Sequence, residues 1–185
     1  MSTRTMGEPI ARREDPRLLS GQGHYLDDIG HTALAAAFVR SPHAHAQIVD
    51  IDVTDALDVD GLMAIYTHDD LPGRLAEPLP LLIPHPSLTH GRTPYALAKD
   101  EVNHVGEAIV MVVAVDRYLA EDACDRIRVE YDVRPPVVGI PSAREAARLV
   151  HDDVPGNVAD TMVQEHGDAT RAIAAASRVL ELDLE

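Results

Sequence analysis

The feature that most constrains this fold is an apolar run at residues 107–115, where the sequence EAIVMVVAV is almost entirely aliphatic. Its eight apolar residues are too few to cross a bilayer, which needs about 20 in a helix. Aliphatic and β-branched side chains on both alternating faces are typical of a strand that is buried on both sides. We therefore expect residues 107–115 to form the central strand of a sheet.

Further elements surround this strand in the sequence. Asp116 can cap a helix that carries Ala120, Cys124 and Ile127 on one buried stripe. Apolar or alternating segments predict four more strands, at residues 34–39, 47–53, 62–66 and 129–133. In the strand at 47–53, the odd-numbered apolar residues from Val49 to Val53 are expected on the buried face. This set of elements predicts an α/β fold, with a mixed sheet and packed helices.

The later part of the chain is less regular. Residues 72–94 contain six prolines, which lack an amide donor and therefore predict an irregular surface excursion. Ser142 to Glu145 match a capping box, which predicts a helix over residues 143–149. A linker at 151–160 follows, and Asp168 can cap one more short helix.

The last residues alternate between leucine and acids. Leu180, Leu182 and Leu184 would lie on one face of a strand. An amphipathic strand needs something to cover its apolar face. We therefore expect more chain or a partner subunit at this point, and self-association of the chain on its own.

The composition restricts the partners of the chain. Its net charge of −15 repels phosphate backbones and anionic lipid, so nucleic acids and membrane surfaces are poor partners. The single cysteine excludes an internal disulfide and an iron–sulfur cluster held by this chain alone. The N-terminal residues lack the apolar segment of a secretory signal peptide, so we expect a cytoplasmic protein.

His43 and His45 are the first candidate functional residues. Their spacing on an extended segment suits metal ligation, but two imidazoles form an incomplete site. We favour a structural role in which the ring nitrogens bond to the backbone. A histidine-based metal-binding protein remains an alternative, which titration with zinc or nickel would test.

Other candidates each have a simpler explanation. Gly21-Gln22-Gly23 begins like a dinucleotide fingerprint, but Leu26 stands where the third glycine belongs, which favours a turn. Asp27-Asp28 suits a solvated turn, and Cys124 an inert core thiol. Surface or interface positions are expected for His85, His90 and His104. The residues by themselves reveal no catalytic constellation.

Several short motifs occur in a fixed order along nearly the whole chain. The longest is Arg40-Ser41-Pro42-His43-Ala44-His45-Ala46. Others are Gly61-Leu62-Met63-Ala64, Val105-Gly106-Glu107, Val129-Glu130-Tyr131 and Gly156-Asn157. In this order they resemble the start of the large subunit of molybdenum hydroxylases, the family of xanthine dehydrogenase, aldehyde oxidase and aerobic carbon monoxide dehydrogenase. One departure is Gly139, which stands where the family commonly has Asp.

The resemblance implies a division of the chain into four parts. These are an N-terminal arm at 1–19, an α/β hammerhead domain at 20–135, a short helix and linker at 136–160, and the start of the molybdenum-cofactor domain at 161–185. In the family, the cofactor loops and the catalytic glutamate lie beyond the part that this chain resembles. The resemblance therefore assigns no catalytic, cofactor-binding or metal-binding residue here.

The resemblance also implies cofactors and partners. The complete enzyme would use molybdopterin, iron–sulfur clusters and FAD, and would oxidise or hydroxylate a small molecule at molybdenum with water as the oxygen source. Its partners would be the molybdenum-cofactor domain or subunit and the iron–sulfur and flavin subunits. The chain alone would be inactive. The alternative is a free-standing, non-catalytic interaction module that docks on a cofactor-bearing partner, and the neighbouring coding sequence would distinguish the two.

Overall fold

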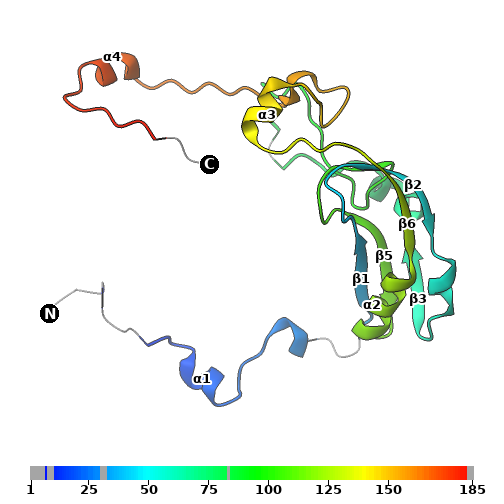
Figure 1. The fold of residues 1–185 in the computed structure, drawn as a ribbon. Coiled ribbons are helices and arrows are strands. Elements are labelled where there is room, and N and C mark those ends of the chain that lie inside the picture. The colour runs from blue at the N-terminus through cyan, green and yellow to red at the C-terminus, as the bar shows by residue number, and fades with distance from the viewer. Residues whose placement is uncertain (1–6, 8–10, 30–32, 83, 183–185) are drawn as a thin grey trace.

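The body of the protein contains two three-stranded sheets (Figure 1). The structure is a computed structural model that describes residues 7, 11–29, 33–82 and 84–182. The first sheet has the order β1-β5-β3 and the second the order β4-β2-β6. The strands are β1 (Ala35–Arg40), β2 (Ala46–Asp52), β3 (Leu62–Tyr66), β4 (Glu101–Val102), β5 (Ala108–Ala114) and β6 (Arg128–Val133).

The predicted central strand is confirmed as β5. It lies between β1 and β3, and Val110 and Val112 are fully buried in it. The α/β class is also confirmed, but the sheets differ from the single mixed sheet that was expected. Within each of the two sheets, all strand pairs are antiparallel. Strand β5 runs opposite to β1 and β3, and strand β2 runs opposite to β4 and β6.

One helix covers the first sheet. Helix α2 (Arg117–Arg126) begins as predicted, with the Asp116 carboxylate accepting the backbone N–H of Leu119 at 3.0 Å. Ala120 and Ala123 are fully buried where the helix packs against β1 and β5. Small residues on this stripe allow the helix to approach the sheet closely.

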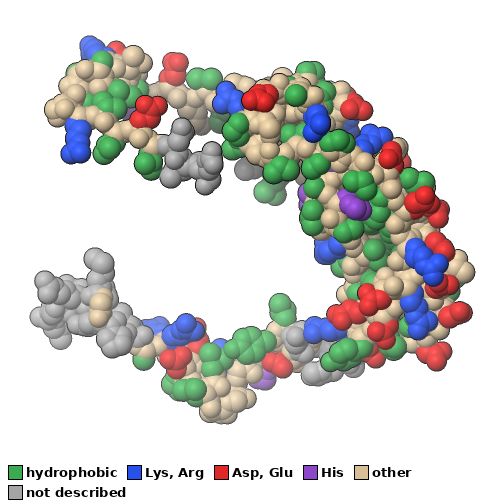
Figure 2. Space-filling model, in the orientation of Figure 1, with side chains coloured by type: hydrophobic (Ala, Val, Ile, Leu, Met, Phe, Trp, Pro, Cys, Tyr) green, Lys and Arg blue, Asp and Glu red, His purple; other side chains and the backbone are tan. Residues whose placement is uncertain are grey.

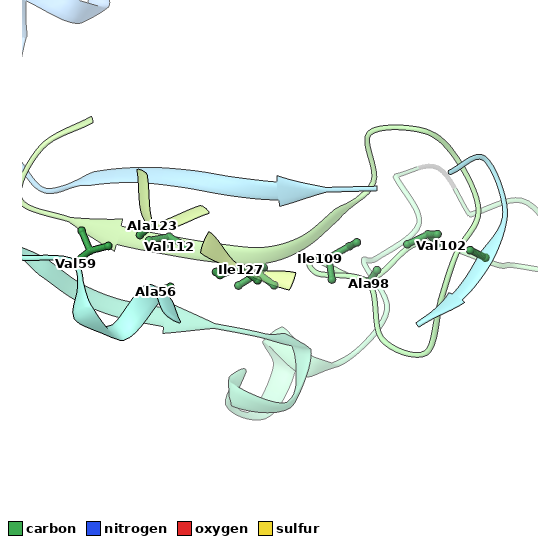
Figure 3. Packing of buried hydrophobic residues seen from close by; sticks show 10 residues of the cluster. Ala56, Val59, Ala98, Val102, Ile109, Val112, Ala123 and Ile127 are labelled. Carbon is green, nitrogen blue, oxygen red and sulfur yellow. The ribbon is translucent and has the colours of Figure 1, made fainter. Parts of the chain in front are cut away.

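A single core joins the two sheets. Figure 3 shows Val112, Ala123 and Ile127 together beside Ala56, while Ile109 and Ala98 continue the packing toward Val102 on β4. The buried members of this cluster are Ala46, Ala56, Val59, Ala98, Val102, Ile109, Val110, Val112, Ala123 and Ile127. Because β5 contributes to both ends of the cluster, the two sheets are expected to unfold as one unit.

Strand β2 departs from the predicted alternation. A β-bulge lies between Ile48 and Asp50, because Ile48 pairs with Tyr131 and Asp50 with the next residue, Glu130. Val49 is therefore the extra residue, and it is 57% exposed. Ile48 packs on the core in its place. The prediction that Val49 faces inward is wrong for this reason.

Long segments extend from both ends of the body (Figure 1). Before the body lies the short helix α1 (Asp15–Leu19), which the sequence analysis did not anticipate. Gly21 follows it with a φ of +72°, and its N–H bonds to the carbonyl of Leu18 at 3.2 Å. The predicted turn at Gly21-Gln22-Gly23 thus ends a helix, which is a common use of glycine.

Helix α3 (Ile140–Glu145) starts earlier than the capping-box pattern predicts. Its N-cap is Gly139, whose φ of +84° suits glycine and not aspartate. Ser142 lies inside the helix and donates a hydrogen bond back to the Gly139 carbonyl at 3.1 Å. Ala146 ends the helix with a φ of +52°, so the predicted helix over residues 143–149 is largely wrong.

The last described segment is extended and solvent-exposed. Helix α4 (Ala169–Ala174) has the predicted cap, since Asp168 accepts the backbone N–H of Arg171 at 2.9 Å. Residues 179–182 form no strand, and Leu180 is 83% exposed. The predicted terminal strand is therefore not formed over these residues, because no described strand lies beside them. Leu184 lies outside the described residues.

Acidic side chains are spread over the face of the body shown in Figure 2, in keeping with the net charge of −15. Among the described helices, none is long and apolar enough to cross a membrane.

Candidate functional site

The motif at residues 40–46 forms a tight connection between the two sheets. Ser41 is buried, and its hydroxyl donates to the carbonyl of His43 at 2.8 Å and accepts the N–H of the same residue at 3.0 Å. Its backbone bonds to the Glu107 carbonyl at 2.9 Å and to the Gly106 N–H at 2.8 Å. The motif thus fixes the passage from β1 to β2 against the turn before β5.

The two histidines of the motif contact different partners. His43 packs edge-on against the ring of Tyr131, with 4.9 Å between the ring centroids. The Nδ1 atom of His45 lies 3.4 Å from the Pro135 carbonyl, and Arg134 donates its N–H to the His45 carbonyl at 2.9 Å. Of the expected contacts between ring nitrogens and the backbone, the structure shows the one at Nδ1 of His45, whereas the contact shown for the His43 ring is packing. The neighbours of the two rings differ: Tyr131 for His43, and Pro135 and Glu101 for His45.

A polar junction lies beside β4, where three segments far apart in the sequence meet. Glu101 has one oxygen 3.9 Å from Nε2 of His45 and the other 3.7 Å from Nδ1 of His151. The His45 Nε2 atom is buried without a hydrogen-bond partner. Arg92 pairs with Asp153 next to this group. We name Arg92, Glu101, His151, Asp153 and His45 the junction cluster.

Two cavities adjoin the junction cluster. The larger has a volume of about 400 Å³ and extends from Arg92 and Tyr95 to His104 and Glu107. The smaller, of about 260 Å³, lies between His45, Arg134 and the segment from Val150 to Asp153. Their charged linings carry both signs, so neither cavity has a clear preference for an anion or a cation.

The ionised form of Asp153 is favoured by its neighbour. The Arg92 guanidinium donates a hydrogen bond to it and lowers the pKa of its carboxyl below the ordinary range. Both side chains are largely solvent-exposed, so salt screens this pair.

The remaining candidates are dispersed. Burial, and then the nearby Asp125 and Glu121, raise the pKa of the Cys124 thiol to about 11, which supports an inert thiol. His85 bonds to the Ser87 hydroxyl at 2.7 Å, and His104 lies 3.4 Å from Glu107. His90 donates its backbone N–H to the Ala159 carbonyl at 3.3 Å, and Asp28 accepts that of Tyr25 at 2.8 Å.

Sequence reasoning did not single out the junction cluster apart from His45. Glu101 and His151 are separated by 50 positions and belong to no local pattern. In the described part of the chain, no three histidine, cysteine, aspartate or glutamate side chains are grouped so that they could hold a metal ion. The chemistry available at the junction is hydrogen bonding and ion pairing between segments.

Comparisons with known proteins agree over most of the chain. The family model described as "Aldehyde oxidase and xanthine dehydrogenase, a/b hammerhead domain" matches residues 20–135. The large subunit of nicotine 6-hydroxylase from Paenarthrobacter nicotinovorans is 36% identical over 179 residues, which are 95% of this chain and 21% of that protein. The carbon monoxide dehydrogenase large chain of Afipia carboxidovorans is 35% identical over 88% of this chain and 19% of its own length.

Solved structures give the same result. Quinoline 2-oxidoreductase from Pseudomonas putida 86 superposes with a TM-score of 0.72 at 34% identity, covering 92% of this chain and 22% of the other. The chain thus spans about a fifth of the length of the relatives that it matches. On this evidence it belongs to the molybdenum hydroxylase family of xanthine dehydrogenase, aldehyde oxidase and carbon monoxide dehydrogenase, and it carries the a/b hammerhead domain of that family.

Proposed function

We propose that this chain is the N-terminal structural portion of the large subunit of a molybdenum-dependent oxidoreductase, and that the catalytic and cofactor-binding residues belong to other parts of that enzyme. The observation that carries the proposal is the family match over residues 20–135, in relatives that are about five times as long. We further propose the division at residues 19, 135 and 160, and a cytoplasmic location.

The chain's own residues do not fit an iron–sulfur cluster. An iron–sulfur cluster needs several thiolate ligands, and the sequence contains one cysteine, which is half-buried and keeps its proton. We therefore assign the iron–sulfur sites of the complete enzyme to partner domains or subunits. We propose the same for the molybdopterin and flavin sites, because the part of the family that this chain matches is the hammerhead domain. The relatives include a subunit of a dehydrogenase complex, which supports an assembly of several subunits.

The work that we assign to this chain is positioning. The core shared by the two sheets gives a stable body, and the segments that extend from it present exposed apolar residues such as Leu19, Leu26, Val163 and Leu180. Exposed apolar side chains on extended segments are typical of surfaces that another domain covers. A free-standing module that docks on a cofactor-bearing partner would use the same surfaces.

A chimera tests the proposal. The matching part of the Afipia carbon monoxide dehydrogenase large chain would be replaced by this chain, and molybdenum content and subunit assembly would be measured. We expect the chimera to assemble and to retain molybdenum, with altered activity. The control is the same exchange with the matching part of the carbon monoxide dehydrogenase large chain of Hydrogenophaga pseudoflava, which is 33% identical to this chain over 78% of its residues. Failure of our chimera to assemble, while the control assembles, would contradict the proposal.

The isolated chain provides a second measurement. We expect it to contain no stoichiometric molybdenum or pterin and to oxidise neither aldehydes nor carbon monoxide. Molybdenum bound one-to-one, measured by plasma mass spectrometry, would show that the cofactor residues lie within these 185 residues and would overturn the assignment.

A further inference from the structure

The segment after α3 is more ordered than a linker. We name residues 146–160 the Asn157 loop, because Asn157 holds it closed. The Asn157 side chain accepts the Val150 N–H at 2.8 Å and donates to the carbonyls of Arg148 at 2.8 Å and Ala143 at 3.0 Å. One side chain therefore uses three hydrogen bonds to join the end of α3 to both halves of the loop.

The backbone of the loop favours asparagine at this position. Asn157 has a φ of +55°, which asparagine and glycine adopt more readily than other residues. Gly156, before it, has a φ of +70°. The loop backbone adds hydrogen bonds from the Val154 N–H to the His151 carbonyl at 3.0 Å and from the Asn157 N–H to the Val154 carbonyl at 3.2 Å. This accounts physically for the Gly156-Asn157 motif.

The closed loop is also fastened to the body. The Ala159 carbonyl accepts hydrogen bonds from the N–H and hydroxyl of Thr89 and from the N–H of His90, at 3.1–3.3 Å. Asp153 pairs with Arg92, and His151 lies beside Glu101 on β4. Val154 is buried, being only 5% exposed. These contacts join the loop to the proline-rich segment and to the second sheet.

Contact with the body stops abruptly after the loop. Asp160 is half-buried, whereas each described residue from 161 to 182 is exposed. Figure 1 shows this part of the chain leaving the region of α3 as an extended segment. The Asn157 loop is therefore the last fixed point before the segment that we assign to the next domain.

We propose that the Asn157 loop is a rigid coupling that sets where and in which direction residues 161–182 leave the hammerhead domain, and that Asn157 is its positioning residue. The coupling itself is a property of this chain. Its use in orienting the next domain rests on the proposed function.

Limited digestion with trypsin tests the coupling directly, because the carbonyl that trypsin attacks at Arg148 is bonded to Asn157. In the 185-residue chain, we expect cleavage after Arg148 to be at least about tenfold slower than after Arg178, which lies in the exposed segment beyond α4. Asn157→Gly keeps the backbone conformation and removes the three side-chain bonds. We expect it to accelerate cleavage after Arg148 by about 10- to 100-fold.

Two controls separate the loop from the fold. Gln164→Ala, which alters a side chain beyond the loop, should leave cleavage after Arg148 unchanged. Cleavage after Arg126 at the end of α2 should stay slow in Asn157→Gly. Cleavage of the wild-type chain after Arg148 as fast as after Arg178 would overturn the proposal. An unchanged rate of cleavage after Arg148 in Asn157→Gly would also overturn it. The same holds if Asn157→Gly accelerates cleavage after Arg126 as much as cleavage after Arg148.

The orienting role needs a separate readout. In the chimera described above, Asn157→Gly should lower the yield of assembled enzyme, whereas Gln164→Ala should not. Full assembly of the Asn157→Gly chimera would remove the orienting role. Failure of the parent chimera would instead count against the proposed function, and the digestion result would stand by itself.

Discussion

Gly61 should be one of the least replaceable positions in the body. It has a φ of +85°, and a Cβ built on it would lie 2.8 Å from Cγ2 of Val115 and 2.9 Å from Cδ1 of Leu119. Gly61→Ala therefore carries two penalties. A left-handed conformation costs a residue with a Cβ about 1–2 kcal/mol. Overlap in a packed site costs about 1–3 kcal/mol, and less where the Leu119 side chain can rotate away.

Gly106 offers a matched control. Its φ is +88°, but a Cβ there meets nothing within 4 Å. Gly106→Ala should therefore cost only the backbone part, about 1–2 kcal/mol, against about 2–5 kcal/mol for Gly61→Ala. The difference between the two variants isolates the steric contact with the strand-to-helix connection after β5.

Urea denaturation followed by circular dichroism measures both variants. With a slope of about 2 kcal/mol per M, the midpoint should fall by about 1–2.5 M for Gly61→Ala and about 0.5–1 M for Gly106→Ala, with the slope unchanged. Equal midpoints for the two variants would refute the reasoning, because they would show that the approach of Val115 and Leu119 contributes nothing.

The remaining predictions concern reactivity, capping, pH and association. With its pKa raised to about 11, Cys124 should resist Ellman's reagent at pH 8 and react fully in urea; rapid native labelling would contradict its burial. Asp116→Ala should lower the free energy of unfolding by about 1 kcal/mol in the same urea assay, by removing the α2 cap; an unchanged midpoint would argue against the cap. Because Arg92 lowers the pKa of Asp153, the stabilisation from this pair is present above about pH 4 and is lost as pH falls through the lowered pKa. Amide hydrogen exchange in the Asn157 loop, corrected for the intrinsic exchange rates, should therefore accelerate below pH 4. The acceleration should be larger in the wild type than in Asp153→Asn, which lacks the titrating carboxyl. Light scattering should show self-association of the isolated chain that Leu182→Lys reduces, and a monomer in both cases would exclude it.

The regular elements could be predicted because their signals are local. The apolar run of β5, the shorter apolar run of β3 and the Asp116 cap each depend on fewer than a dozen neighbouring residues, and the structure contains all three. The start of α3 was mispredicted for a related reason. Two local signals compete there, and the positive φ of Gly139 prevails over the capping-box pattern at Ser142.

The junction cluster and the Asn157 loop could not be predicted in the same way. Glu101 meets His45 because β4 pairs with β2, and it meets His151 because the Asn157 loop folds back onto β4. The resemblance included Gly156-Asn157 but not its role, since the groups that Asn157 bonds become neighbours only when the loop closes. Likewise, the strand predicted at Leu180 and Leu182 has the right pattern but no described strand beside it.

The bulge at Val49 has a consequence for how this domain can vary among relatives. On either side of it, β2 pairs with consecutive residues of β6, Tyr131 and Glu130. Removal of Val49 would thus leave an uninterrupted ladder in which Ile48 and Ile51 keep their inward orientation. In most strands a one-residue deletion inverts every following side chain, but here it would cause no inversion. Homologous domains that are one residue shorter should accommodate the gap at this position.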